Sequence, residues 1–522
     1  MKTHSLILIF TIIISGIIGC QTNQAPTPID LHELTIRDIH KAFKDGKYNS
    51  QRLVSAYLER IENLDPNINA ITAVNPDALT IAKELDDDYQ RTKVLRPLHG
   101  IPVIVKNNIH TKGLETTAGA LALQNFIPDN DAFIISKLVE AGAIILAKSN
   151  LAEWAFTPWG SFSSTNGATL NAYNQDYTSA GSSGGTGASI AANFGVIGLG
   201  TDTGGSIRLP SSHGSLVGFR PTMGLVSRSG IVPCELRQDM AGPMCRTMED
   251  AVRVLEIITG YDKSDELTRF SQGKIPKSYT QFLKKDGLNG SRIGVLREIS
   301  ETEIDPEILT LFEKAIEDMK LMGAEIVDSV NIPNFSTLRK NHWCSDFKTE
   351  IENYLKTYVL NDTLSTLDDI IRIGTKSTFT AEHLTFYTTH SGRSVNPEIE
   401  CLDAYSDQKR IAFRKAIEDY MDLLKLDALI YPTCNVKPYR MDSIVEEYIV
   451  EEHTGAVSPH TGQPSFIVPM GFMQDNLPTG VEFLGRMYSE PTLIKLAYSY
   501  EQGTKHRRTP DLEKAITTDK MH

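Results

Sequence analysis

The segment GTDTGGSIRLP at residues 200–210 places three glycines and Ser206 within eleven residues. Glycine loses more conformational freedom on ordering than any other residue, so this density indicates that the backbone itself has a role. Two such roles are common: exposed N–H groups that hold an anion, and a side chain displayed on a strained turn. The residues around this segment decide which role applies to Ser206.

The flanking segments alternate between strand patterns and helix patterns. Apolar, β-branched runs predict buried strands at residues 101–105, 143–149 and 196–201. Between these strands, an amphipathic run at 131–142 and an alanine-rich run at 183–195 predict helices. This alternation predicts an α/β fold whose sheet contains parallel neighbours.

Further stretches extend the pattern on both sides. Residues 50–65 carry apolar side chains at helical spacing, and Ser50 is the expected N-cap of that helix. Downstream, residues 292–296 predict a strand, and a helix is expected to start at Asp305. The polar segment 340–400 is expected to be mostly helical surface.

Composition limits the classes of partner. The 522-residue chain has a formal net charge of −13 and a pI near 5.5. Because a nucleic-acid-binding protein needs a basic face, this charge argues against a nucleic-acid partner. Hydrophobic residues make up 41% of the chain and charged residues 22%, which is typical of a globular protein with a large core.

The N-terminus has the pattern of an export signal. Lys2 precedes the apolar run LILIFTIIISGII, which is short for a membrane span. The run ends in IIGC at residues 17–20 and resembles the lipobox of bacterial lipoproteins, in which Cys20 is lipidated. A plain signal peptide or a short anchor is the alternative. The lipobox implies an exported, membrane-anchored lipoprotein, on the periplasmic face of the outer membrane if the host has one, with the chain after Cys20 soluble.

The remaining cysteines and the histidines indicate neither a disulfide framework nor a metal site. Five cysteines are scattered over a long chain, without CxxC or comparable ligand spacing: Cys234, Cys245, Cys344, Cys401 and Cys434. His453 and His460 flank a loop-like stretch, and two histidines alone are more typical of polar surface. No metal and no cofactor are expected.

Three segments hold the candidate chemistry. Lys106 ends the apolar run GIPVIVK, Ser182 and Ser183 lie in a GSSGG turn, and Ser206 closes the glycine-rich stretch. Each has an alternative explanation: a lysine that ends a strand is usually solvated, and a glycine-rich turn before a helix often holds phosphate. Neither GxxxxGK[ST] nor GxGxxG occurs, so nucleotide binding is disfavoured.

Together these segments resemble the amidase signature family, over residues from about 34 to about 508. The resemblance implies one α/β domain at residues 34–510, built on a large mixed sheet covered by helices. Residues 1–20 are then the signal peptide, 21–33 a linker and 511–522 a polar tail.

The resemblance also assigns catalytic roles. Ser206 is the nucleophile, Lys106 is the base in its neutral form, and Ser182, which follows a cis peptide bond from Gly181, relays the proton between them. Backbone N–H groups are expected to form an oxyanion hole, at the four residues Thr203, Gly204, Gly205 and Ser206. Such donors are often the largest catalytic contribution.

Some residues near these segments have secondary roles or depart from the family pattern. Asp202 and Arg208 are expected to stabilise the loop as an ion pair. Asn107 stands where the family usually has an acidic residue, and Ala180 where it usually has glycine. Neither change removes a catalytic group.

The resulting hypothesis is an amide hydrolase that acts through an acyl-enzyme on Ser206. The alternatives are an amidotransferase of the kind that amidates glutamyl-tRNA, disfavoured by the exported N-terminus, and a non-catalytic binding lipoprotein. Trp154 and Phe156 are expected either to line the mouth of the site or to be core aromatics, and Ser183 is a further candidate substrate-binding residue. Residues 223–244 and 489–502 look most like bacterial peptide amidases, so peptide C-terminal amides are the expected substrates; small aliphatic or aryl amides are the alternative.

Overall fold

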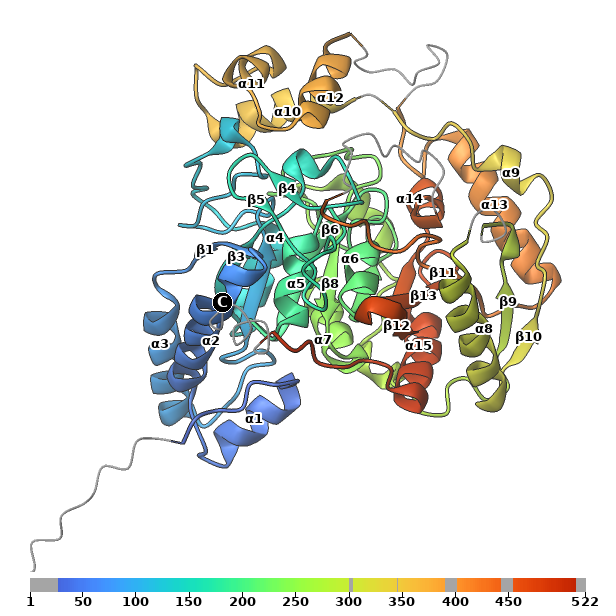
Figure 1. Ribbon diagram of the computed structural model, residues 1–522, viewed down its shortest axis with the longest axis horizontal. Helices are drawn as coiled ribbons and strands as arrows, with labels where there is room; N and C mark the ends of the chain where they lie inside the picture. The colour runs from blue at the N-terminus through green and yellow to red at the C-terminus, as the bar shows by residue number, and fades with distance from the viewer. Residues whose placement is uncertain (1–26, 300–303, 345, 390–400, 443–453, 513–522) are drawn as a thin grey trace, which may run out of the picture.

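The computed structural model describes residues 27–299, 304–344, 346–389, 401–442 and 454–512. An eleven-stranded sheet runs through the molecule in the order β1-β3-β2-β6-β8-β7-β12-β13-β11-β9-β10 (Figure 1). Its strands are β1 (Ile71–Val74), β2 (Pro102–Lys106), β3 (Ile144–Ser149), β6 (Ile197–Asp202), β7 (Val217–Arg220), β8 (Met240–Cys245), β9 (Arg292–Val295), β10 (Glu325–Val327), β11 (Ala428–Pro432), β12 (Ser465–Phe472) and β13 (Pro478–Leu484). The strands β4 (Phe162–Ser163) and β5 (Gly167–Ala168) pair separately.

The sheet is mixed. Strand β2 is parallel to both of its neighbours, β3 and β6, and β9 is parallel to both β10 and β11. The central strands from β6 through β8, β7, β12 and β13 to β11 pair antiparallel. Since both strand–helix stretches contribute to this sheet, the predicted α/β class and single mixed-sheet domain are confirmed. The boundaries at residues 34 and 510 stay predictions.

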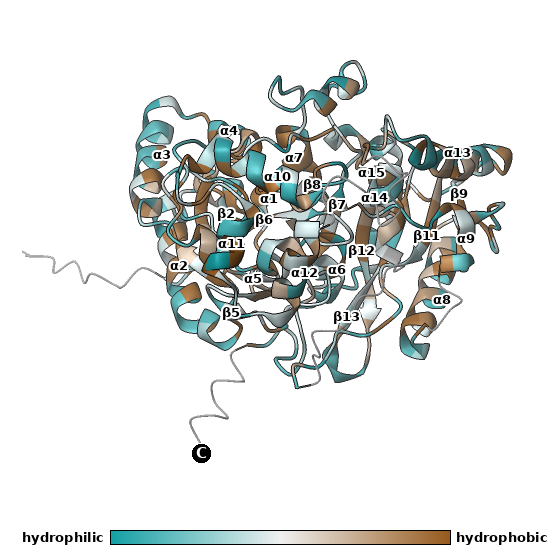
Figure 2. Cartoon of the chain, turned by 90° about the horizontal axis from the view of Figure 1, so that it is seen from above, coloured by the Kyte–Doolittle hydropathy of each residue, from teal (hydrophilic) through white to brown (hydrophobic). Residues whose placement is uncertain are grey.

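Helices surround the sheet. They are α1 (Ile36–Lys44), α2 (Ser50–Leu64), α3 (Ala78–Thr92), α4 (Phe133–Glu140), α5 (Gly184–Ala191), α6 (Arg208–His213), α7 (Met248–Ile258), α8 (Pro306–Leu321), α9 (Phe335–Leu338), α10 (Phe347–Tyr354), α11 (Leu367–Ile373), α12 (Thr378–Thr389), α13 (Gln408–Leu423), α14 (Val457–Thr461) and α15 (Glu490–Thr504). Outer helices such as α3 show both hydrophilic and hydrophobic residues along their length, as expected for helices with one buried face (Figure 2). No helix in the described ranges is long and apolar enough to cross a membrane.

Two helix starts test the predicted caps. Asp305 caps α8, because its carboxylate accepts the N–H of Glu307 at 2.8 Å. The prediction for α2 was wrong by one residue: Asn49 is the cap and accepts the N–H of Arg52 at 3.0 Å. Asparagine and serine both cap well, so two adjacent candidates could not be separated by residue type.

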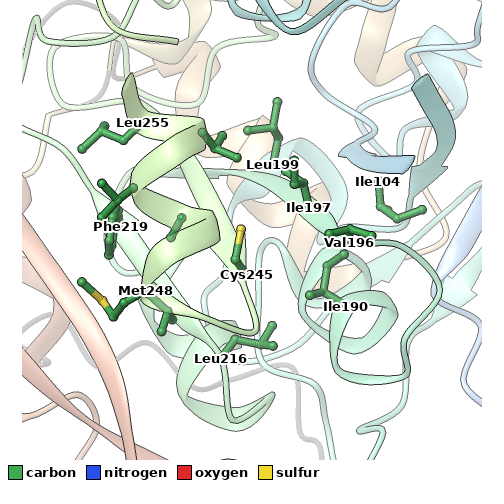
Figure 3. Close-up of a cluster of buried hydrophobic side chains, with 14 of the residues drawn as sticks. Ile104, Ile190, Val196, Ile197, Leu199, Leu216, Phe219, Cys245, Met248 and Leu255 are labelled. Carbon is green, nitrogen blue, oxygen red and sulfur yellow. The ribbon is translucent and has the colours of Figure 1, made fainter. Parts of the chain in front are cut away.

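Alternation along β6 places α5 and α7 on opposite faces of the sheet. A Cβ at Gly198 would clash with Thr186 and Ile190 of α5, so the even-numbered positions of β6 lie close against that helix. Ile197 and Leu199 point the other way, toward the core that α7 covers (Figure 3). Ile104 of β2 pairs with Gly198, so Lys106, two residues on, also lies on the α5 face.

Helices α10, α11 and α12 form a cap above the sheet (Figure 1). Their apolar side chains build a hydrophobic cluster of their own with Trp154 and Val232, separate from the main core. The segment 340–400, expected to be mostly helical surface, contains α10, α11 and α12 in its described part, and these helices bury side chains in this cluster. The predicted signal segment with Cys20, and residues 513–522 of the predicted tail, lie outside the described residues.

Candidate active site

Lys106 is the last residue of β2, and its side chain is fully buried. Its Nζ donates to Ser182 Oγ and to Thr201 Oγ1, each at 2.7 Å. Burial lowers the pKa of Lys106 to about 7, because removal from water disfavours the charged form. The solvated-lysine alternative is therefore wrong, and the amine can exist in its neutral form near neutral pH.

Ser182 and Ser183 lie in the turn that leads into α5. The peptide bond between Gly181 and Ser182 is cis, as the family resemblance implied. A Cβ at Gly181 would clash with the carbonyl oxygens of Gly160 and Thr157, so no larger residue fits there. Ala180 has a φ of 58°, in the left-handed region that favours the glycine expected at this position.

Ser183 is hydrogen-bonded to the end of β6. Its side chain is fully buried, and its Oγ donates to the Thr201 carbonyl at 3.1 Å and accepts the Thr201 N–H at 3.3 Å. Both hydrogen bonds join the side chain to the end of β6, and substrate contact by Ser183 stays a prediction. Its backbone N–H donates to the carbonyl of Ser206 at 3.3 Å and so holds the two serine loops together.

Ser206 lies on the loop between β6 and α6 and is 3% exposed. Within the described ranges its hydroxyl makes no hydrogen bond, while Lys106 and Ser182 are hydrogen-bonded to each other beside the same pair of loops. The structure thus brings Lys106, Ser182 and Ser206, which are far apart in sequence, to one end of strands β2 and β6.

Three of the four predicted oxyanion donors are available. The N–H groups of Thr203, Gly204 and Ser206 have no acceptor among the described residues. The prediction was wrong for Gly205, whose N–H donates to Asp202 Oδ1 at 2.9 Å. The carboxylate of Asp202 accepts this hydrogen bond from within its own loop. The Gly205 N–H, which the sequence suggested was free, is therefore occupied.

The predicted ion pair between Asp202 and Arg208 is present and fully buried. Arg208 contacts both carboxylate oxygens, at 3.0 and 3.1 Å, and Arg220 lies 3.2 Å from Oδ1. Although burial opposes ionisation, these two guanidinium groups hold the pKa of Asp202 well below its usual range. Arg208 also pairs with Glu482 of β13 at 2.7 Å, so the nucleophile loop is fixed to two strands of the sheet.

The departure at Asn107 is accommodated by neutral partners. The side chain is 1% exposed, and its amide donates to Thr72 Oγ1 at 3.0 Å and to Thr117 Oγ1 at 3.1 Å. A neutral amide beside Lys106 adds no negative charge that would favour the protonated lysine.

Sequence patterns missed a second contact of the glycine loop. Thr203 Oγ1 donates to Asp239 Oδ1 at 2.5 Å, and Asp239 Oδ2 accepts the N–H of Cys234 at 2.9 Å. Asp239 lies just before β8, and no motif marks it as a partner of the loop.

Trp154 and Phe156 differ in burial and in the surroundings of their side chains. Trp154 is 1% exposed and packs in the cap cluster with its ring 5.9 Å from that of Phe347, which favours the core-aromatic interpretation. Phe156 is half-buried and lies 4.8 Å from the Phe347 ring and 5.6 Å from the Tyr387 ring. Substrate contact stays a prediction for Phe156.

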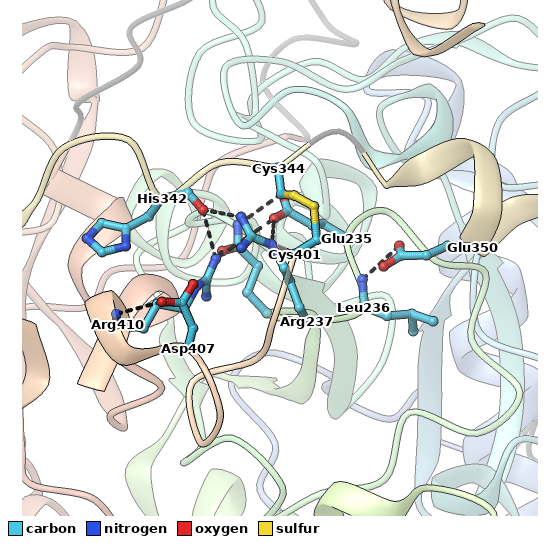
Figure 4. The surroundings of a disulfide bond; sticks show 10 residues. Glu235, Leu236, Arg237, His342, Cys344, Glu350, Cys401, Asp407 and Arg410 are labelled. Carbon is cyan, nitrogen blue, oxygen red and sulfur yellow. Dashed lines mark hydrogen bonds and ion pairs between the residues drawn. A yellow bond between two sulfur atoms is a disulfide. The ribbon is translucent and has the colours of Figure 1, made fainter. Parts of the chain in front are cut away.

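A disulfide joins the segment before α10 to the segment before α13. Cys344 and Cys401 are bonded, with Cα atoms 5.8 Å apart, so the cysteine prediction was wrong for this pair (Figure 4). A separation of 57 residues gives no local signal for such a pairing. Beside the disulfide, Trp343 lies so close to the nucleophile loop that a Cβ at Gly204 would clash with its ring. Trp343 therefore forms a wall above the glycine loop.

Comparison with known proteins agrees with this geometry. The family model described as Amidase matches residues 52–494. The structure of native peptide amidase from Stenotrophomonas maltophilia is 34% identical, covers 92% of this chain and 99% of its own, and superposes with a TM-score of 0.81. A probable amidase from Arabidopsis thaliana is 34% identical and covers 92% of both chains. A glutamyl-tRNA(Gln) amidotransferase component from Acinetobacter baumannii strain AYE is 30% identical, with 91% of this chain and 97% of that protein covered.

Proposed function

Because this chain belongs to the amidase signature family and is a hydrolase of carbon–nitrogen amide bonds, we propose that it acts through an acyl-enzyme on Ser206. The observation that carries the proposal is the 2.7 Å contact between Ser182 and a buried Lys106 whose pKa is lowered to about 7. A hydroxyl is a weak nucleophile until a neighbouring base takes its proton, and a neutral amine can take it.

The proposed reaction runs in two halves. Ser206 Oγ attacks the carbonyl carbon of the amide while its proton passes to Ser182 Oγ, and the Ser182 proton passes to Lys106 Nζ. The tetrahedral intermediate collapses as the carbon–nitrogen bond breaks, and the proton returns through Ser182 to the leaving nitrogen. Water then attacks the ester on Ser206 with the same proton path, releasing the carboxylate and restoring the serine.

The oxyanion is stabilised by the backbone of the same loop. Its negative charge is proposed to bind at the N–H groups of Thr203, Gly204 and Ser206, which have no acceptor within the described ranges. Because Asp202 and Asp239 fix both sides of the loop, these donors need little rearrangement as the charge develops.

A glutamyl-tRNA amidotransferase is the second candidate, since one such protein is 30% identical to this chain. Two features favour the hydrolase. The net charge of −13 does not suit a partner surface for tRNA, and the proposed export of the chain would separate it from charged tRNA. Release of ammonia from a simple amide without any tRNA or partner protein distinguishes the hydrolase from a transferase that needs its complex.

For the substrate we propose the C-terminal amide of peptides. Support comes from the 34% identical peptide amidase, which this chain matches over 92% of its length. Trp343 lies against Gly204, two residues before Ser206, and is proposed to narrow the space beside the nucleophile. A narrow site beside the scissile carbon admits NH₂ as the leaving group but excludes a continuing chain.

A three-substrate comparison tests this substrate class. We expect ammonia release from a peptide amide, no cleavage of internal bonds in the corresponding free acid, and slower turnover of a small aliphatic amide. Ammonia assays and mass spectrometry of the products give these rates. Hydrolysis of the aliphatic amide alone would contradict the peptide proposal and leave the Ser206 mechanism intact.

We also propose that the chain is exported and anchored through lipidated Cys20. The Cys344–Cys401 disulfide supports export, since disulfides persist mainly in oxidising compartments. The apolar run and the IIGC sequence before residue 21 are the basis for the anchor.

Cys20→Ser is expected to abolish lipid incorporation and to leave the protein uncleaved or released from the membrane fraction, because no thiol remains to carry the acyl chains. Labelled fatty acid and fractionation measure both outcomes, and Cys234→Ser is the matched control that should keep the label. A Cys20→Ser protein that still incorporates fatty acid would exclude the lipoprotein assignment.

A further inference from the structure

A cavity of about 370 Å³ lies between the loop that follows β3 and the start of α12. Aromatic rings supply much of its wall: Trp159, Phe162, Phe379 and Tyr439. The rings of Trp159 and Tyr439 meet edge to face at 5.7 Å. Such a volume is enough for part of a small organic ligand.

The cavity adjoins both serine loops. Trp159 packs against the small cluster that contains Ala180 and Leu209. Ala180 lies two residues before Ser182, and Leu209 three residues after Ser206. Gly160, which also lines the cavity, lies directly against Gly181, so the cavity is next to the turn that carries Ser182.

Glu153, one of the residues that line the cavity, has an incompletely paired carboxylate. Glu153 is 3% exposed, and its Oε2 accepts from Ser164 Oγ at 2.6 Å and from Thr375 Oγ1 at 2.7 Å. Its Oε1 is buried and has no hydrogen-bond partner among the described residues. Burial raises the pKa of Glu153, although the hydroxyls of Ser164 and Thr375, the backbone of Ser164 and the charge of Lys376 oppose this. A buried carboxylate oxygen without a donor is costly, so this atom lacks a group that a ligand can supply.

The missing group has a defined chemistry. Both hydroxyls donate to Oε2, so Oε1 needs a further donor, and a cation would also balance the charge. Lys376 is exposed on the rim and forms no ion pair with Glu153 in the described ranges, so its charge acts on that carboxylate only from a distance. The faces of aromatic rings attract cations as well. An ammonium group combines donors with positive charge and fits both features of the cavity.

We propose that this cavity binds the ammonium group of the substrate, so that amides with a free amine on the acyl side are the preferred substrates. The inference rests on the proposed hydrolysis at Ser206 and narrows its substrate class. It assigns Glu153 a positioning role: the residue orients the acyl part and takes no part in bond cleavage.

Matched substrates test the assignment. We expect a dipeptide amide with a free N-terminus to have a kcat/KM about tenfold or more above that of its N-acetyl derivative, the effect expected of one charged hydrogen bond. Glu153→Gln should remove this preference, mainly through KM, and leave the acetylated substrate within about twofold. Glutamine keeps an oxygen that accepts from Ser164 and Thr375, so the hydrogen bonds between residue 153 and the segment before α12 are retained. Glu382→Gln, an exposed carboxylate on α12, is the control and should change neither rate.

Two results would overturn the assignment. An equal loss of kcat/KM on both substrates in Glu153→Gln would mean that Glu153 only supports the fold. Equal kcat/KM values of the wild type for the free and the acetylated amide would show that the cavity does not bind the substrate ammonium group. Calorimetry with the Ser206→Ala protein provides a readout that needs no turnover: the free dipeptide amide should bind more tightly than the acetylated one, and equal affinities would refute the proposal. If neither amide releases ammonia with any variant, the hydrolase proposal fails, while calorimetry still reports on the ammonium site.

Discussion

Ser206→Ala is expected to lower kcat/KM by about 10⁴-fold or more while leaving the fold intact, because loss of a nucleophile removes the covalent step itself. The side chain is small, and its hydroxyl makes no hydrogen bond in the described part of the chain, so little packing or bonding is lost. The melting temperature should stay within about 2 °C of the wild-type value, as for other substitutions that create no cavity or unpaired group. Ammonia release and thermal unfolding measure the two quantities.

Ser212→Ala is the matched control for this experiment. Ser212 lies in α6, is 1% exposed, and its Oγ has no hydrogen-bond partner within the described ranges. The control should therefore retain activity within about twofold, as expected of a substitution that removes no partner. Activity of Ser206→Ala within about tenfold of wild type would reject Ser206 as the nucleophile.

Lys106→Met is expected to lower kcat/KM by about 10²–10⁴-fold, the range typical of a lost proton-transfer group. The pH profile should report the same residue. Burial lowers the pKa of Lys106 to about 7, so the amine is protonated and inactive below that pH and neutral above it. We therefore expect kcat/KM to rise with pH through about 7 and then to level off.

Lys148 provides a matched control for the Lys106 experiment. It is also fully buried, with a pKa lowered by burial to about 7, but it lies in β3 on the other face of the sheet and bonds to Thr111 and Thr116. A Lys148→Met protein that folds should keep the acid limb of the profile. A flat profile between about pH 5.5 and pH 9, or full activity of Lys106→Met, would exclude Lys106 as the base.

The resemblance to the amidase signature family, carried by three short motifs taken together, was needed to predict the catalytic residues. Lys106 ends a strand, Ser182 lies in a glycine-rich turn and Ser206 follows a strand; the parallel strands β2 and β6 bring their ends to one edge of the sheet. The ion pair of Asp202 with Arg208 spans six residues within one loop, so it was also predictable.

Contacts between distant segments were not predictable in the same way. Glu482 bonds to Arg208 across 274 residues, and Trp343 contacts the Gly204 position from the segment before α10, with no periodicity in the sequence to link either pair. The pairing of Cys344 with Cys401 likewise depends on how the chain on either side of α10, α11 and α12 comes together. At Gly205 the residue type was suitable, but the direction of the N–H is set by Asp202.

Covalent labelling tests most directly the central claim that Ser206 becomes acylated during turnover. A fluorophosphonate probe, which reacts with activated serines, should add once to the wild-type protein, and peptide mass spectrometry should place the adduct on Ser206. The adduct should be absent from Ser206→Ala and should form more slowly with Lys106→Met. An adduct that persists in Ser206→Ala, or a wild-type protein that hydrolyses amides but is neither labelled nor inhibited by the probe, would contradict the account.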